Sequence, residues 1–520
     1  MKQKMAKKLA CIAFAGMMLP MAAQAAEADL QLKVDKLMQE VNDLKGTVQR
    51  VQDKSLSKWL SVGGEYRFRV DSLHGETVEY TNANAVGAYL ATPGNVANPG
   101  AGPTPAEMGA AFGFANVPAY KPKNETLYTS KLGLDLHAKA TQDVTVNVKL
   151  GMYKTFGSQS DVATSGDYFS DRVGTFDGTL SHVPSTGLLN VDRAYATWSN
   201  IGEQPVWFSV GRRPSTNGAP SNLKLNNERP GNGGTPALLV DYAFDGMTIG
   251  YAPDIEMLPG FYTKLCYGRG FDSGYKTATN DIKDTDMLGL AIIPVDTDPL
   301  RVWLQWNRGF NIFDFPVMSN SVFGDTQPNT NLGSIDWYGA GAMSTLKNVG
   351  PGNLNFFADF GLSLTNPNTN TMPGTPLGLM TGTFNGGPEA GKDKTGWAAF
   401  AGVRYDLPSK TKIGFEFNHG SKNWITFAPA ADDLWTAKAG TRGNVFEPYV
   451  IQELDLKPIS SYFSKTFFKV GYQYYDFEYT GSNNWVGAPV KISDITPGTM
   501  LMMTPVKKAH DIYATFEVKF

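Results

Sequence analysis

Cysteine is scarce in this sequence. Only Cys11 and Cys266 occur among 520 residues, and Cys11 lies in an N-terminal segment that we expect to be removed during export. A chain left with Cys266 alone forms no intramolecular disulfide and carries no Cys-x-x-Cys-His haem attachment site. We therefore predict a fold without disulfides and no cofactor bound by this chain itself.

Long apolar runs are also missing after residue 25. No segment there approaches the roughly 18 uninterrupted apolar residues that a membrane-spanning helix needs. In lipid, only helices and closed β-barrels satisfy all of their backbone hydrogen bonds. If this chain crosses a bilayer, we expect it to do so as a closed sheet.

The small net charge and the absence of catalytic motifs exclude further classes of protein. The formal net charge of −3 provides no strongly basic field for nucleic acid. The five histidines stand alone, without His-Glu-x-x-His spacing, and neither a Gly-x-Ser-x-Gly elbow nor a phosphate loop is present. We predict no catalytic residues, no metal site and no nucleic-acid partner, and hence that the protein is not an enzyme.

An export signal is the first feature that the sequence does contain. Four lysines stand among the first eight residues, an apolar run follows over residues 9–21, and an A-x-A cleavage site ends at Ala25. We expect residues 1–25 to be a signal peptide and the mature chain to begin at Ala26.

The last ten residues alternate strictly between apolar and mostly polar side chains, a period of two that is typical of a β-strand. A half-buried strand of a soluble domain shows the same pattern. The sharper interpretation is the closing strand of an outer-membrane barrel, because the chain ends on an aromatic residue of the apolar stripe. That ending resembles the signal read by the barrel-assembly machinery, here Phe516, Val518 and Phe520.

The same alternation recurs along residues 55–520, which predicts an all-β transmembrane antiparallel barrel of about 16–18 strands. Residues 60–70 match the alternation of the last strand, so we expect the first and last strands to pair. Asp245-Gly246 predicts a tight hairpin turn between strands at 237–244 and 247–252. The predicted long loops are 71–125, 214–235, 311–333, 366–394 and 481–505, of which residues 73–80 could continue the first strand.

Charged residues fall on the more polar face of these strands. Because an arginine or lysine facing lipid at mid-depth costs roughly 2 to 4 kcal/mol, we expect this face to line the lumen. The charges then either pair along the wall and merely solvate it, or form an arginine ladder opposite carboxylates that selects solutes by charge. The predicted channel-lining residues are Arg67, Arg69, Arg193, Arg213, Arg301, Arg404, Glu65, Asp135, Asp359 and Glu416.

Residues 26–54 have a different period. Apolar residues are spaced alternately by four and three, which predicts a short N-terminal coiled-coil helix. Valine at the a positions and leucine at most d positions favour a parallel dimer, whereas a single helix packed on the chain's own body is the alternative. The predicted oligomerisation seam consists of Leu30, Val34, Leu37, Val41, Leu44, Val48 and Val51.

Two segments carry a family resemblance. Residues 191–198 (VDRAYATW) and 206–213 (VWFSVGRR) look like paired porin strands in which a Val-Gly-Arg element ends a strand and leads into a loop. With the heptad and residues 72–75, the chain resembles a porin-like outer-membrane β-barrel family of unknown function from metal-reducing deltaproteobacteria. Such a resemblance implies a homotrimer, whereas the heptad favours a dimer, so we expect a homo-oligomer of either number.

Two functions fit this pattern. The first is an outer-membrane porin whose water-filled channel lets small hydrophilic solutes or ions diffuse through, with the N-terminus in the periplasm. The second is the barrel sheath of a porin-cytochrome electron conduit, which needs a multihaem cytochrome as partner because this chain has no haem site. An inward loop that narrows the lumen would exclude the sheath.

Overall fold

The computed structural model describes residues 36–41, 45, 59–157, 168–173, 183–185, 187–214, 218–229, 238–278, 282–321, 324–389, 391–428, 433–456 and 464–520. The chain divides into two units, Met1–Ser61 and Val62–Phe520. In the first unit, residues 36–41 are helical, and Leu37 and Val41 of the predicted seam are exposed. The other five seam residues lie outside the described residues.

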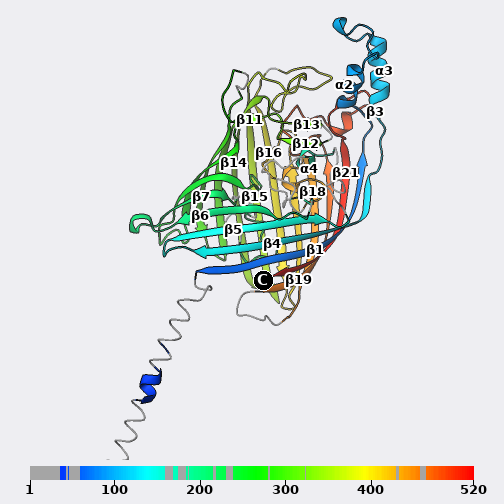
Figure 1. Ribbon diagram of the computed structural model, residues 1–520. Helices are drawn as coiled ribbons and strands as arrows, with labels where there is room; N and C mark the ends of the chain where they lie inside the picture. The colour runs from blue at the N-terminus through cyan, green and yellow to red at the C-terminus, as the bar shows by residue number, and fades with distance from the viewer. Residues whose placement is uncertain are drawn as a thin grey trace, which may run out of the picture. The chain divides into compact units, whose positions relative to one another are not determined.

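The second unit is built around one closed antiparallel barrel. Within the described residues, sixteen strands form this barrel, which confirms the predicted fold class (Figure 1). The strands are β1 (Leu60–Thr77), β4 (Lys123–Lys139), β5 (Val144–Thr155), β6 (Asn190–Trp198), β7 (Val206–Arg213), β8 (Phe244–Tyr251), β9 (Tyr262–Phe271), β10 (Thr285–Asp296), β11 (Leu300–Phe313), β14 (Asn331–Val349), β15 (Gly352–Pro367), β16 (Lys394–Asp406), β17 (Thr411–Gly420), β18 (Gly443–Glu453), β19 (Lys465–Phe477) and β21 (Val506–Lys519).

The first and last barrel strands pair with each other, as the sequence predicts. β1 and β21 run antiparallel with Phe68 opposite Phe516 and Val70 opposite Ala514. The backbone N–H groups of Gly64 and Phe520 also donate to each other's carbonyls, at 2.7 and 2.9 Å between nitrogen and oxygen. The pairing leaves β21 without a free edge, because its other edge is bonded to β19.

The two ends of the barrel differ in their connections. At one end the strands are joined by short turns, such as residues 140–143, 297–299, 350–351 and 407–410. At the other end the connections are longer: residues 78–122, 156–189, 214–243, 272–284, 314–330, 368–393, 421–442 and 478–505. This difference between the two ends is the one expected of an outer-membrane barrel.

The long connections contain small elements of their own. In residues 78–122 the structure has two helices, α2 (Ala83–Ala91) and α3 (Pro105–Ala115), which the sequence interpretation missed; Thr104 and Glu107 form a capping box at the start of α3. Residues 71–77, which the predicted loop 71–125 included, belong to β1, so the strand continues through residues 73–77 but not to residue 80. The remaining elements are β2 (Tyr80–Asn82), β3 (Asn116–Val117), β12 (Met318–Ser321), β13 (Gly324–Thr326), β20 (Met500–Leu501), α4 (Ser170–Val173), η2 (Pro99–Ala101), η4 (Ile201–Glu203), η5 (Lys438–Gly440) and η6 (Ile492–Asp494).

One predicted turn is wrong. Asp245 and Gly246 lie inside β8, where Gly246 is opposite Gly211 on β7 and Gly268 on β9. A β-carbon at Gly246 would come within 2.0 Å of the carbonyl oxygen of Tyr267, so glycine is needed there for the close approach of neighbouring strands rather than for a turn. The segment before it, predicted as a strand, instead places Leu238 and Leu239 in a buried cluster.

The strands present two different faces. Along β15 the apolar residues Phe356 and Phe360 are exposed, whereas Phe357 and Asp359 between them are buried. β21 alternates in the same way, with Ile512 and Ala514 exposed and Tyr513 buried. The barrel is therefore apolar outside, and its polar residues point inward. Within the described residues, no helix is long and apolar enough to cross a membrane.

Candidate functional site: the barrel lumen

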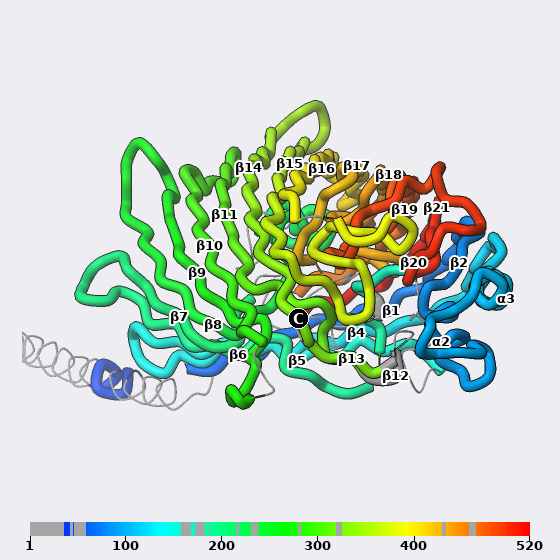
Figure 2. Tube along the Cα trace, turned by 90° about the horizontal axis from the view of Figure 1, so that it is seen from above, coloured from blue at the N-terminus to red at the C-terminus, as the bar shows by residue number. Residues whose placement is uncertain are grey.

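Segments of the chain occupy part of the lumen (Figure 2). Within the barrel, Trp337 on β14 donates from its indole nitrogen to the carbonyl oxygen of Ile425 at 2.8 Å and stacks edge-on against Phe427. Thr426 donates to the carbonyls of Leu238 and Leu239 at 2.7 Å. Residues 238–240 and 424–428 thus form an apolar core inside the barrel, held against the inner face of β14 and its neighbours.

A second inserted segment, residues 218–229, forms a series of turns whose backbone carbonyls meet a set of cationic side chains. Four consecutive carbonyl oxygens accept hydrogen bonds from side chains of barrel strands, and the positive charge of the donors strengthens these bonds. The donors are Arg404 to Leu223 (2.6 Å), Lys469 to Lys224 (3.4 Å), Lys519 to Leu225 (2.6 Å) and Lys465 to Asn226 (3.3 Å).

Buried carboxylates of the barrel strands also hold the inserted segments, through ion pairs with their lysine side chains. Glu447 on β18 accepts from Lys224 at 2.6 Å and from Lys438 at 2.5 Å, and Glu416 on β17 also pairs with Lys438. Burial opposes the charge of Lys438, but the two carboxylates outweigh it and raise the pKa of its amine. Glu447 therefore anchors residues 218–229, which are distant in the sequence, and both carboxylates anchor the connection between β17 and β18.

Another buried charge cluster joins the first and last strands. Arg69 on β1 donates to Asp71 at 2.5 Å and to Asp511 on β21 at 2.7 Å, and its guanidinium lies 4.4 Å from the ring centroid of Tyr513. Arg69 is only 1 % exposed. An arginine that bridges two buried carboxylates in this way fixes the geometry of strand closure rather than contacting a passing solute.

The inner face of the barrel is buried on one side and half-exposed on the other. In the middle of β15 to β18, inward charges such as Asp359, Glu416 and Glu447 are buried, whereas Lys412, Glu453 and Lys465 nearer the short turns are half-buried. On β4 to β9, Asp192 is buried, and the other inward charges away from the strand ends are half-exposed. We conclude that water reaches the middle of the wall mainly along β4 to β9. The half-exposed charges are Lys131, Asp135, Lys149, Arg193, Arg213 and Lys264.

This half-exposed wall is mostly cationic. Lys149 pairs with Glu65 on β1 at 2.7 Å and lies 3.7 Å from Asp135, which in turn lies 3.7 Å from Arg193. In the described part of β4 to β9, the inward cations still outnumber the carboxylates Asp135 and Asp192, of which Asp192 is buried and lies 3.7 Å from Arg193. An anion passing along the wall meets a favourable potential.

A large polar cavity of about 1670 Å³ lies at the short-turn end. Residues of both charge signs line it, including Arg301, which pairs with Asp296 at 2.6 Å, and Arg404, which pairs with Asp406 at 2.7 Å. The turn of residues 218–229 borders the same cavity. The cavity is a hydrated vestibule between the inserted turn and the end of the barrel.

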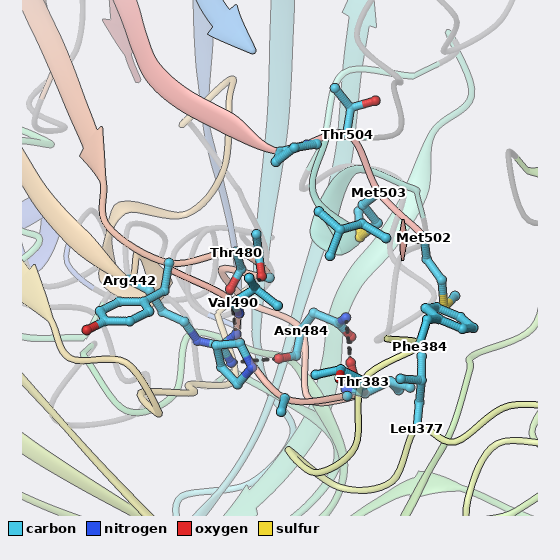
Figure 3. A pocket seen from close by; sticks show the side chains of 18 of the residues that line it. Leu377, Thr383, Phe384, Arg442, Thr480, Asn484, Val490, Met502, Met503 and Thr504 are labelled. Carbon is cyan, nitrogen blue, oxygen red and sulfur yellow. Dashed lines mark hydrogen bonds between the residues drawn. The ribbon is translucent and has the colours of Figure 1, made fainter. Parts of the chain in front are cut away.

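A smaller cavity, of about 710 Å³, lies among the long loops and is lined largely by apolar groups such as Phe384 and Met502 (Figure 3). Arg442 borders it and donates to the backbone carbonyls of Trp424, Thr480 and Asn484. Burial lowers the pKa of Arg442 to about 9. Its hydrogen bonds tie three loop segments together.

The structure separates the ten predicted lining residues into groups. Glu65, Asp135 and Arg193 lie together on the half-exposed wall, Arg213 lines a cavity between β7 and β11, and Arg301 and Arg404 border the vestibule. Arg67, Arg69, Asp359 and Glu416 are buried, with Asp359 accepting from the indole of Trp303 at 2.6 Å.

Sequence reasoning overlooked several lysines of the lumen. Lys131 on β4 and Lys149 on β5 lie on the polar faces of their strands, so the alternation could have identified them. Lys224 lies in the predicted loop 214–235, and Lys438 lies between strands and outside every predicted long loop; no periodic signal exists at either position. Among the described residues, no group of three or more His, Cys, Asp or Glu is placed to hold a metal ion.

Residues 121–520 match a family model described as a protein of unknown function, DUF3373. The chain belongs to this family. A search of curated proteins gave no match. The family therefore supplies no activity, and the function has to be argued from the barrel.

Solved structures similar to this DUF3373 protein are outer-membrane proteins. They include OprB of Pseudomonas putida (12 % identity, TM-score 0.43, 92 % of this chain and 97 % of that chain). An anion-selective porin from Comamonas acidovorans (11 %, 0.39, 89 % and 99 %) and the trimer form of OmpT from Vibrio cholerae (13 %, 0.38, 89 % and 100 %) are also similar. At these identities and TM-scores the likenesses assign no function to this chain.

Proposed function

We propose that the protein is an outer-membrane porin whose partly filled lumen lets small hydrophilic solutes or ions diffuse through. The observation that carries this proposal is the contrast between the two faces of one closed barrel: apolar and exposed outside, charged and half-exposed inside along β4 to β9. Membrane barrels with aqueous lumens have this arrangement.

The outer face supports placement in a bilayer. Ile249, Phe360, Val470 and Ile512 are between 46 and 54 % exposed, and they belong to strands all around the barrel. Soluble monomers rarely expose contiguous apolar surface of this extent. In lipid the same side chains are in a favourable environment, and the closed ring leaves no unpaired strand edge.

The proposed orientation follows from the connections. Outer-membrane barrels have short periplasmic turns and longer external loops, so the N-terminus and the vestibule face the periplasm. Phe516, Val518 and Phe520 end the last strand where the assembly machinery would read them. The coiled-coil helix of residues 26–54 would then hold a homo-oligomer together in the periplasm.

The cytochrome sheath is the weaker proposal. A barrel that surrounds a cytochrome needs an empty lumen, whereas residues 218–229, 238–240 and 424–428 occupy part of this one. The buried ion pair of Lys224 with Glu447 on β18 fastens residues 218–229 to the barrel wall.

Planar-bilayer recording tests the porin proposal. Purified protein should give discrete conductance steps, and the Arg193→Glu variant should shift the reversal potential toward cation preference. The shift shows that the current belongs to this protein and not to a contaminating porin. Absence of conductance above background from folded protein would overturn the proposal.

A further inference from the structure

A cavity opens on the inner wall between β7 and β11, separate from the vestibule; its empty space is about 610 Å³ when the open solvent at its mouth is included. Two cationic residues from neighbouring parts of the wall, Arg213 and Lys264, line it, and no Asp or Glu is among its lining residues in the described part of the chain. Other inward cations of the wall, such as Lys149 with Glu65, do pair with carboxylates.

Arg213 is held in place by aromatic rings rather than by an acid. Its guanidinium carbon lies 5.2 Å from the ring centroid of Tyr195 and 5.7 Å from that of Trp207. No ion pair of Arg213 occurs among the described residues. Stacking on aromatic faces orients a guanidinium while its N–H donors stay available for a carboxylate.

A buried donor faces the same space. Asn307 is 7 % exposed, and its side-chain nitrogen has no hydrogen-bond partner within the described structure. A β-carbon at Gly289 would lie 2.4 Å from the amide oxygen of Asn307, so the glycine makes room for this side chain. A buried amide donor without a partner is costly, and an acceptor in the cavity would satisfy it.

The rest of the cavity is apolar. Phe244, Val240, Met287 and Ala291 contribute to its lining. A bare inorganic ion would leave this surface without contacts, whereas an anion with a hydrocarbon or aromatic body would bury it. The lining therefore combines donors for a negatively charged head with walls for an apolar body.

We propose that this cavity is a binding subsite for small organic anions that carry a carboxylate on an apolar or aromatic body. The carboxylate bonds to Arg213 and Asn307, Lys264 adds positive potential, and the body packs on Phe244 and Met287. The subsite rests on the proposed porin function in one respect: it lies on the wall past which solutes would diffuse.

Binding of benzoate to purified protein in detergent tests the subsite without requiring conduction. Calorimetric titration should show saturable binding that the uncharged analogue benzamide does not reproduce. Arg213→Gln should weaken benzoate binding about tenfold, since a charge-assisted hydrogen bond is lost. The matched control Arg212→Gln, on the same strand, should bind as the parent does. Equal binding by both variants, or none by the parent, would overturn the subsite.

Cys266 offers a test that needs no substitution, because this half-buried thiol lines the same cavity. An anionic methanethiosulfonate should modify it at least about tenfold faster than a trimethylammonium one, and benzoate should slow the reaction. Mass spectrometry of the peptide that contains Cys266 measures both rates. Faster reaction of the cationic reagent, or no protection by benzoate, would contradict the subsite.

The two proposals fail in different ways. Protein that binds benzoate but gives no conductance steps retains the subsite and loses the porin. Protein that conducts but neither binds benzoate nor protects Cys266 retains the porin and loses the subsite.

Discussion

The charge cluster around Glu447 gives the sharpest prediction about the inserted segments. Glu447 is fully buried and accepts from Lys224 (2.6 Å), Lys438 (2.5 Å) and the hydroxyl of Tyr513 (2.8 Å). Glu447→Gln keeps the shape and removes the charge, which leaves both lysines with one carboxylate fewer. We expect residues 218–229 and 433–442 to detach from the wall more often while the barrel stays closed.

The free-energy cost of Glu447→Gln depends on the carboxylates that still pair with the two lysines. Breaking a buried ion pair costs about 3 to 5 kcal/mol. Since Lys438 keeps Glu416 and Lys224 keeps Asp433, at 3.4 Å, we expect about 3 kcal/mol. That loss raises the detached fraction by about a hundredfold.

Limited trypsin digestion measures this change, because detachment exposes Lys224 and Lys438 to cleavage. Folded barrel is followed on the same gel by its shift in mobility on heating. The control is Glu125→Gln, which removes a carboxylate from an exposed pair with Lys123 and should leave cleavage unchanged. Equal cleavage of Glu447→Gln and parent protein would refute the role of Glu447 as an anchor.

Three further predictions concern the barrel and its loops. Arg69→Met leaves two buried carboxylates without their shared cation, so the unfolding free energy should fall by about 3 to 5 kcal/mol, measured by denaturant titration in detergent. Gly246→Val places a β-carbon against the carbonyl of Tyr267, so the yield of folded barrel should drop, and a yield equal to the parent's would contradict the close approach. Thr104→Ala removes the N-cap of α3 and should destabilise that helix by about 1 kcal/mol, seen as faster hydrogen exchange near Glu107 with no change in the barrel.

Much of the fold is visible in the sequence because alternation is a local property. A residue such as Ile512 must face lipid and its neighbour Tyr513 must face inward, whatever the rest of the chain does. The pairing of β1 with β21 follows as well, since a barrel in lipid tolerates no open edge. The Asp245-Gly246 turn was misplaced because a dipeptide signal does not reveal that β7 and β9 approach Gly246 closely.

The sequence by itself determined the closed barrel, its apolar outer face and its charged inner face, because each depends on a period of two along one strand. Only the tertiary structure decided which inward charges meet water. Lys224 and Glu447 are far apart in the sequence, yet their contact helps to fill one side of the lumen and leaves β4 to β9 half-exposed. Non-periodic loops fold into a barrel through such long-range pairs, and no local pattern encodes them.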